Sequence, residues 1–344
     1  MSLDPEAIGL KVGIELHRQL NTKHKLFCSC PTRKVGEEKE TKFYRMLRVT
    51  ESELGEIDPA AKFEVEKGIH IQYIAGERTS CLVEADEEPP HDLNREALES
   101  TLIIALALHS NIVDEVHVMR KIVIDGSNTT GFQRTMVVAM GGYLEAAGRK
   151  VGVQTICLEE DAARLVGRKD VYKVYHLDRL GVPLIEISLA PVTATPEEIE
   201  EIALTLGRLL RASKRVARGL GTVRQDVNIS IEGGGIVEVK GLKTHADCDD
   251  MRALLDYYDA KVDQQPRLKG IFVVNHYRRV EPEKKEKPYT DGAMELAQRK
   301  GFCLLTTTDL YFAMENALNN LDLRETLKAK IMNGIGLIKL TKFE

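Results

Sequence analysis

The most constraining feature of this chain is a pair of ionisable side chains, Glu15 and His17, within the strand-like segment Val-Gly-Ile-Glu-Leu-His at residues 12–17. Successive side chains of a β-strand point to opposite faces, so residues two apart project together. A carboxylate and an imidazole on a half-buried strand must be satisfied by a partner, a water molecule or a metal ion. The fold therefore has to bring further polar groups against this strand.

Two later acidic segments are candidates for those polar groups. Residues 158–162 read Leu-Glu-Glu-Asp-Ala, and Glu186 ends the apolar run Gly-Val-Pro-Leu-Ile-Glu at residues 181–186. We expect Glu160 and Glu186 to meet His17 in the folded protein.

Composition is typical of a soluble globular chain with one large or two ordinary domains, since 43% of the 344 residues are apolar and 29% are charged. The first residues lack the basic and apolar regions of a secretory signal, and no apolar run is long enough to span a bilayer, so we expect a cytoplasmic protein without membrane contact. With a net charge of -5, nucleic-acid binding would require a local basic patch.

The six cysteines are too sparse for a disulfide framework in a chain of this size. Cys28 and Cys30 form a Cys-x-Cys pair, but a tetrahedral zinc site needs about two more soft ligands, and no second pair follows nearby. We expect these cysteines to be thiols.

Hydrophobic periodicity predicts an α+β protein in which strands come first. The Thr195-Pro196-Glu197-Glu198 sequence combines an N-cap, a proline at the first helical position and a glutamate three residues after the cap. The spacing predicts strands at 62–66, 70–74 and 120–124 and helices at 92–109 and 195–210.

A β-hairpin is predicted where residues 223–231 alternate cleanly, a triple-glycine turn follows, and residues 236–240 return. If Ile231 pairs with Gly235, then Asn228 lies opposite Glu238 and Asp226 lies opposite Lys240.

Beyond Gly241 the pattern changes to helices at 246–259, 290–299 and 309–318 that alternate with strands at 270–274 and 302–305. Such alternation is typical of parallel βαβ units. The charged, proline-containing stretch 281–287 is predicted to be a solvated loop. We therefore divide the chain into a mixed, largely antiparallel α+β domain at 1–241 and a smaller α/β segment at 242–344.

The first 241 residues resemble the cradle domain of the GatB/GatE family, with details that favour the archaeal E subunits. The resemblance extends from about Leu10 to Gly241 and is carried by the motifs Val-Gly-Ile-Glu-Leu-His (12–17), Lys-Leu-Phe-Cys-Ser-Cys (25–30), Glu-Leu-Gly-Glu-Ile-Asp-Pro (53–59), Asp-Gly-Ser-Asn-Thr-Thr-Gly-Phe-Gln-Arg-Thr (125–135), Leu-Glu-Glu-Asp-Ala (158–162), Gly-Val-Pro-Leu-Ile-Glu-Ile (181–187) and Val-Arg-Gln-Asp-Val-Asn-Ile-Ser (223–230).

This resemblance implies a subunit of a tRNA-dependent amidotransferase with an ATP and Mg²⁺ dependent kinase site. Such a site phosphorylates the glutamyl γ-carboxylate of Glu-tRNA(Gln), and ammonia from an asparaginase-like glutaminase partner then displaces the phosphate to give Gln-tRNA(Gln). A homodimer is also implied. By correspondence, the resemblance assigns metal-binding positions to His17, Glu160 and Glu186, with Glu15, Asp226 and Glu238 nearby.

Cationic side chains around the Gly-Ser-Asn-Thr-Thr-Gly loop are candidates for phosphate contacts, because phosphoryl transfer depends on positioning and charge neutralisation. The candidates for nucleotide binding are Arg120, Lys121, Ser127, Asn128, Thr129 and Arg134. The same loop is also compatible with an ordinary glycine-bearing turn.

A second resemblance begins at the hairpin. Asp226 followed by Glu238-Val-Lys240 fits the spacing of PD-(D/E)XK nucleases, and residues 238–318 resemble the second half of such a domain. In that family the carboxylates bind Mg²⁺ and the lysine assists the attacking water. Glu238 and Lys240 are equally compatible with a cross-strand salt bridge.

Three hypotheses follow. The leading one is a working amidotransferase cradle. The second is a binding-only or inactive remnant, truncated or fused, because the tRNA-holding domains of E subunits are not recognisable after Gly241. The third is a metal-dependent nuclease.

Overall fold

The computed structural model describes the chain except for residues 1–4, 7–9, 34–35, 48–64, 66–67, 69, 170–171, 232–234, 243–244, 260, 264–267, 278–286, 312–320 and 341–344. The motif at 53–59, most of the strand predicted at 62–66, nearly all of the loop predicted at 281–287 and most of the helix predicted at 309–318 lie outside the described residues. The chain divides into two compact units, one formed by residues 15–190 and 200–225 and the other by residues 1–14, 191–199 and 226–344.

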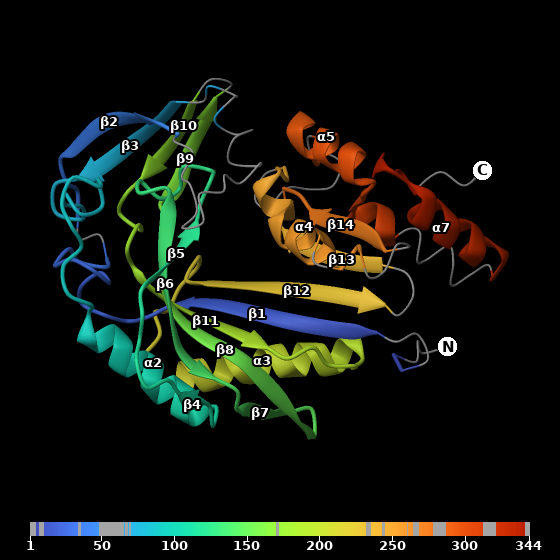
Figure 1. Ribbon diagram of the computed structural model, residues 1–344, viewed down its shortest axis with the longest axis horizontal. Helices are drawn as coiled ribbons and strands as arrows, with labels where there is room; N and C mark the ends of the chain where they lie inside the picture. Colours follow the sequence, from blue (N-terminus) through green and yellow to red (C-terminus); the bar gives the residue numbers. More distant parts are fainter. Residues whose placement is uncertain are drawn as a thin grey trace. The chain divides into compact units, whose positions relative to one another are not determined.

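The unit of residues 15–190 and 200–225 contains an antiparallel sheet that carries the acidic segments (Figure 1). Its central strands are buried on both faces where they carry the charged side chains that matter below. In sheet order its strands are β1 (Lys11–Gln19), β11 (Pro183–Leu189), β8 (Arg149–Glu160), β6 (Phe132–Met140) and β4 (Asn111–Ile112), with β5 (Met119–Ile122) on β6 and β7 (Tyr143–Ala146) on β8.

A second, four-stranded sheet in the same unit supports the loop at residues 125–131. Its core contains Ile71, Tyr73 and Tyr175, and the Tyr73 hydroxyl donates a hydrogen bond to the carbonyl of Gly126 at 2.6 Å. The strands are β2 (Glu40–Met46), β3 (His70–Gly76), β10 (Tyr172–His176) and β9 (Arg164–Lys169), in that order.

Two helices form where the sequence predicts them. Helix α2 (Arg95–Ala107) begins after Asn94, whose side chain accepts a hydrogen bond from the amide of Ala97. Helix α3 (Pro196–Ala212) begins with the predicted capping box, in which Thr195 and Glu198 each accept a hydrogen bond from the other's backbone amide, at 3.3 and 2.8 Å.

The unit that contains residues 226–344 has helices on both faces of strands β13 to β16, which run parallel, while β12 pairs antiparallel with β13 (Figure 1). Alternate residues of strand β14 (Lys269–Asn275) pack into different hydrophobic cores. Phe272 and Val274 pack into the core on one face, and Ile271 and Val273 pack into the core on the other. This double burial explains the unbroken apolar run of this strand. The elements are β12 (Val223–Ile231), β13 (Gly235–Gly241), β14 (Lys269–Asn275), β15 (Cys303–Thr306), β16 (Gly336–Leu337), the 3-10 helix η1 (Asp249–Met251), α4 (Arg252–Asp259), α5 (Asp291–Lys300) and α7 (Leu321–Asn333).

The hairpin register agrees with the prediction, since Ile231 pairs with Gly235 and Asn228 pairs with Glu238. The α+β class is confirmed, while the proposed division at residue 241 remains a prediction. Among the described residues, no helix has the length and apolar character needed to cross a membrane.

Candidate active site

The strands β1 and β11 place His17 directly opposite Glu186. The Nε2–H of His17 donates to Oε2 of Glu186 at 3.0 Å, and Oε1 of Glu15 lies 3.8 Å from the same nitrogen. Each of the three residues offers a donor atom, and these atoms all lie within 4.8 Å of one another. The alternation of β1 thus brings Glu15 and His17 together, as predicted, and Glu186 joins them.

Glu159, and not Glu160, completes this group. Oε2 of Glu159 lies 4.0 Å from Nε2 of His17, and Oε1 accepts a hydrogen bond from the Thr135 hydroxyl at 3.0 Å. Glu160 follows it on β8 and so points to the other face of the sheet. The structure therefore does not bring Glu160 to His17, although both carboxylates are buried, and a metal-binding role for Glu160 stays a prediction.

Lys121 is a cation that the structure places beside two of these carboxylates. Its Nζ lies 3.7 Å from Glu159 and 3.5 Å from Glu186, and the side chain is 54% exposed. We call Glu15, His17, Lys121, Glu159 and Glu186 the His17 cluster. Glu159 and Glu186 share the ammonium of Lys121, so a proton or a bound cation would neutralise this pair further.

The pKa values of the neighbouring carboxyl groups Glu159 and Glu186 shift in opposite directions. Burial, followed by the charge of Glu186, raises the pKa of Glu159. Burial would also raise the pKa of Glu186, but the hydrogen bond from His17 and the charge of Lys121 outweigh it and lower this pKa to about 2. These opposite shifts favour protonation of Glu159 over protonation of Glu186. A divalent cation would compete with a proton at this position.

The ligand atoms of Glu15, His17 and Glu186 fit the coordination chemistry of Mg²⁺. Carboxylate oxygens are the ligands that Mg²⁺ prefers, and one imidazole with retained waters can complete such a site. The Nδ1 atom of His17 is buried and lacks a hydrogen-bond partner among the described residues, so packing and Glu186 orient this ring.

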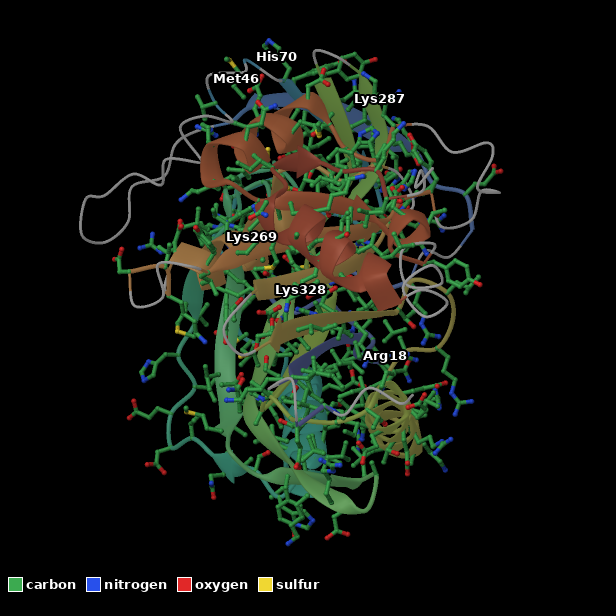
Figure 2. The ribbon with its side chains drawn as sticks, turned by 90° about the vertical axis from the view of Figure 1, so that its right-hand side faces the viewer. Arg18, Met46, His70, Lys269, Lys287 and Lys328 are labelled. Carbon is green, nitrogen blue, oxygen red and sulfur yellow. The ribbon has the colours of Figure 1, made fainter. Side chains whose placement is uncertain are left out.

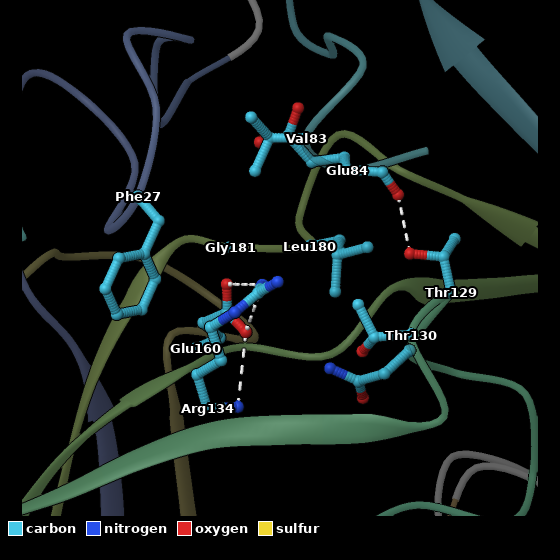
Figure 3. Close-up of a pocket in the computed structure, with 10 residues that line it drawn as sticks. Phe27, Val83, Glu84, Thr129, Thr130, Arg134, Glu160, Leu180 and Gly181 are labelled. Atoms are coloured by element: carbon cyan, nitrogen blue, oxygen red, sulfur yellow. Dashed lines mark hydrogen bonds and ion pairs between the residues drawn. The ribbon is translucent and has the colours of Figure 1, made fainter. Parts of the chain in front are cut away.

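On the opposite face, Arg134 holds Glu160 (Figure 3). The guanidinium donates to both carboxylate oxygens, at 3.0 and 3.2 Å, and lies over the ring of Phe27. Burial nevertheless raises the pKa of Glu160, although Arg134 opposes it. The adjoining cavity measures about 10 Å³, which is room for about one water molecule.

The loop at residues 125–131 lines a much larger cavity of about 530 Å³, together with residues of β2 and β3. This volume is within the range of small-molecule sites. Asn128 and Thr129 both line it, and the amide nitrogen of Asn128 is buried without a partner among the described residues. Ser127 donates its backbone amide to Asp125, and Arg120 is exposed on β5.

A group of sulfur ligands lies elsewhere in the same unit. Cys28, Cys30, Cys81 and Glu84 each offer a donor atom within 4.8 Å of the others, a set that could hold a tetrahedral ion. Burial raises the pKa of Cys81 to about 11, and Lys25 Nζ lies 3.6 Å from Glu84. Cys81 and Glu84 were not predicted from the sequence, because a long stretch of chain separates them from Cys28; their i, i+3 spacing was the available signal.

In the other unit, the predicted residues Asp226, Glu238 and Lys240 lie on the hairpin, and we call them, with Asp250, the Glu238 cluster. Lys240 Nζ lies 3.0 Å from Glu238 and donates to the carbonyl of Asp250 at 2.7 Å. Glu238 is 2% exposed and accepts a hydrogen bond from the amide of Leu254 at 2.8 Å. Burial raises the pKa of Glu238 against the opposing charge of Lys240.

Sequence comparison shows that the chain belongs to the GatB/GatE catalytic domain family, whose profile matches residues 10–267. Among similar proteins, the E subunits of glutamyl-tRNA(Gln) amidotransferase from Aeropyrum pernix and Sulfurisphaera tokodaii are 58% identical over 241 residues, or 70% of this chain. The corresponding protein of Archaeoglobus fulgidus is 57% identical over 243 residues. These matches cover 37%, 38% and 39% of the relatives, so the chain spans under two fifths of their length.

Comparison with solved structures finds endonucleases at low similarity. The match to the apo form of EndoMS covers 61% of this chain and 93% of the EndoMS chain, at 14% identity and a TM-score of 0.18. A repair endonuclease from Pyrococcus abyssi covers 61% and 94%, at 15% identity and a TM-score of 0.17. Scores this low support no argument about fold or function.

Proposed function

We propose that this chain is the kinase cradle of a Glu-tRNA(Gln) amidotransferase, which uses ATP and Mg²⁺ to phosphorylate the glutamyl γ-carboxylate of Glu-tRNA(Gln). The observation that carries the proposal is the convergence of Glu15, His17 and Glu186 in a member of the GatB/GatE family. The named relatives are subunits of an enzyme for this substrate.

In the proposed reaction, a γ-carboxylate oxygen attacks the terminal phosphorus of ATP and ADP leaves. Ammonia then attacks the glutamyl carbonyl and displaces phosphate, which gives the amide. A bound Mg²⁺ supplies charge neutralisation on the phosphate oxygens. Glu15, His17 and Glu186 would hold it.

The side chains around this position have separate proposed tasks. Lys121 is half exposed, so its ammonium can turn from Glu159 and Glu186 toward a phosphate once a cation neutralises those carboxylates. The unpartnered amide of Asn128, with Thr129, supports placing the nucleotide in the cavity of about 530 Å³. Arg134 is engaged with Glu160, which favours a positioning role for this pair.

We further propose that an asparaginase-like glutaminase subunit supplies the ammonia, that the cradle pairs with a second copy, and that the complex is cytoplasmic, where aminoacyl-tRNA is used. The family, and the naming of the relatives as subunits, support these assignments.

The experiment incubates the chain with ATP, Mg²⁺, Glu-tRNA(Gln) and ammonium chloride, so that free ammonia replaces the partner. ADP is measured, and the amino acid released from the tRNA is analysed for glutamine. We expect ADP formation that depends on the glutamyl group, and glutamine in the product.

The variant Glu186→Gln should abolish ADP formation and glutamine formation. The control Glu145→Gln, which changes an exposed carboxylate on β7, should leave both unchanged. ADP formation that ignores Glu-tRNA(Gln) or survives Glu186→Gln would refute the proposal, and no ADP formation would identify an inactive remnant. Cut tRNA in the same tube would instead favour the nuclease hypothesis.

A further inference from the structure

The four-stranded sheet of β2, β3, β10 and β9 presents three buried polar side chains to the loop at residues 125–131. Tyr73 on β3 lies opposite Tyr175 on β10, with ring centroids 6.2 Å apart, and Lys173 shares their face because it lies two residues before Tyr175. All three side chains belong to residues that are at most 3% exposed. Polar groups buried this deeply need hydrogen-bond partners, and the loop supplies them.

The three side chains donate to two adjacent carbonyl groups of the loop. The hydroxyl of Tyr73 donates to the carbonyl of Gly126 at 2.6 Å. The hydroxyl of Tyr175 and the ammonium of Lys173 donate to the carbonyl of Asp125, at 3.1 and 3.2 Å. Burial, followed by the charge of Asp125, raises the pKa of Tyr73, so this hydroxyl stays protonated and remains a donor at neutral pH.

The loop also packs closely against the sheet and against a neighbouring turn. Gly126 has a φ angle of 84°, which favours glycine, and a Cβ atom there would lie 2.8 Å from Cδ1 of Ile71. Further along the loop, the hydroxyl of Thr129 donates to the carbonyl of Glu84 at 2.7 Å (Figure 3). The backbone is therefore fixed on both sides of Asn128.

Asn128 is the residue whose position these contacts determine. It is 3% exposed, and its side-chain oxygen accepts a hydrogen bond from the hydroxyl of Ser127 at 3.5 Å. Its amide nitrogen has no hydrogen-bond partner among the described residues, and Asn128 lines the cavity of about 530 Å³. A buried donor without an acceptor is costly, which favours a ligand that brings an oxygen to this nitrogen.

The rest of the cavity suits the apolar faces of such a ligand. Met46 and Ile71 line it from β2 and β3, and Met46 pairs with His70 at the ends of these strands; Met46 and His70 are labelled in Figure 2. Val123 and Ile124 add further apolar lining. An apolar wall with a few precisely placed donors is typical of small-molecule sites and is compatible with a nucleotide base.

We propose that Tyr73, Tyr175 and Lys173 are positioning residues, which fix the loop so that the amide of Asn128 donates to an oxygen of the bound nucleotide. The inference rests on the proposed function, because that function places ATP in this cavity. It adds the four-stranded sheet as the part of the unit that orients the nucleotide. The two hydroxyls and the ammonium act through the loop, since each is bonded to a loop carbonyl.

The test is a double-mutant cycle on the affinity of the full chain for the non-hydrolysable analogue AMP-PNP with Mg²⁺, measured by calorimetry without tRNA. Asn128→Ala should raise the dissociation constant at least about tenfold, and Tyr73→Phe and Tyr175→Phe should each raise it about fivefold. Each double variant with Asn128→Ala should bind as Asn128→Ala alone does, because the hydroxyls act through Asn128. A residue with a merely structural role would not show this non-additivity.

The matched control is Tyr143→Phe on β7, which removes a tyrosine hydroxyl outside this cavity and should leave the affinity unchanged. Unfolding midpoints of all variants are measured alongside. If Tyr175→Phe is unfolded at the assay temperature, the cycle with Tyr73→Phe decides.

The proposal would be overturned if the fold-changes of the single variants multiplied in the double variants, because the hydroxyls would then act independently of Asn128. Unchanged affinity in both tyrosine variants, or no measurable binding of AMP-PNP by the unaltered chain, would overturn it as well. Failure of the proposed function is distinguishable. The expected cycle without ADP formation from Glu-tRNA(Gln) would support this inference and refute that function, whereas glutamyl-dependent ADP formation with normal AMP-PNP affinity in Asn128→Ala would refute this inference alone.

Discussion

The His17 cluster and the Glu238 cluster each place one lysine among three carboxyl groups, but they hold that lysine differently. In the Glu238 cluster, Lys240 pairs with Glu238, whose other oxygen accepts a hydrogen bond from the amide of Leu254. In the His17 cluster, the ammonium of Lys121 lies 3.7 Å from Glu159 and 3.5 Å from Glu186, and this side chain is 54% exposed. A buried ammonium that also donates to a backbone carbonyl is suited to holding a hairpin and a helix together, whereas an exposed ammonium can move away and leave its carboxylates to a cation.

The largest effect that tests this comparison is expected for Lys240→Met. Removal of the ammonium leaves the buried Glu238 carboxylate without its ion-pair partner, which should lower the free energy of unfolding by about 3 to 5 kcal/mol at neutral pH. Denaturant unfolding followed by circular dichroism measures it. The double variant Glu238→Gln with Lys240→Met should recover most of the loss; equal loss in both would contradict the ion-pair account.

The same variant has a predicted pH dependence. Burial already raises the pKa of Glu238, and without Lys240 it rises further. A carboxyl group whose pKa is higher in the folded state binds its proton more tightly there, so folding gains stability as the pH falls toward the unfolded value of about 4.3. The deficit of Lys240→Met should therefore shrink on acidification from about pH 8 to about pH 5.

A second variant, Glu186→Gln, should weaken cation binding and leave the stability of the fold almost unchanged. We expect it to weaken binding of Mn²⁺, measured by calorimetry, by at least about 100-fold, since even residues that only orient a ligand cost 10- to 100-fold. Its unfolding midpoint should stay close to that of the unaltered protein, because the neighbouring Lys121 and Glu159 can re-pair. If Glu186→Gln instead lowered the unfolding midpoint and left the affinity for Mn²⁺ unchanged, the His17 cluster would have a structural role.

The change Lys121→Met should raise the affinity for Mn²⁺ by about tenfold, because an ammonium 3.5 and 3.7 Å from two carboxylates competes with the cation. The same variant should lower ADP formation if Lys121 also contacts phosphate. Weaker Mn²⁺ binding in calorimetry would show that Lys121 is not a competitor.

The smallest predicted effect is the release of a proton when a cation binds to the His17 cluster. Because the pKa of Glu159 is raised, proton binding at this carboxyl should compete with cation binding, so affinity should fall as the pH is lowered. Calorimetry in two buffers with different ionisation enthalpies should detect proton release on Mn²⁺ binding, and Glu159→Gln should remove it. An equal release in that variant would place the proton elsewhere.

The sequence predicted local structure more completely than it predicted the site. Alternation and capping placed β12, α3 and the pair of Glu15 with His17, because those patterns are set by neighbours along the chain. The choice between Glu159 and Glu160 depends on which face of β8 meets β1 across β11, and two adjacent acidic residues do not encode it. The meeting of Cys81 with Cys28 likewise depends on tertiary packing.

The most direct test is the position of a bound ion. Crystals of the full chain soaked in Mn²⁺ would be measured for anomalous scattering. The account predicts a peak among Glu15, His17 and Glu186 and none beside Glu238. A peak at Asp226 and Glu238 with none at His17 would contradict it.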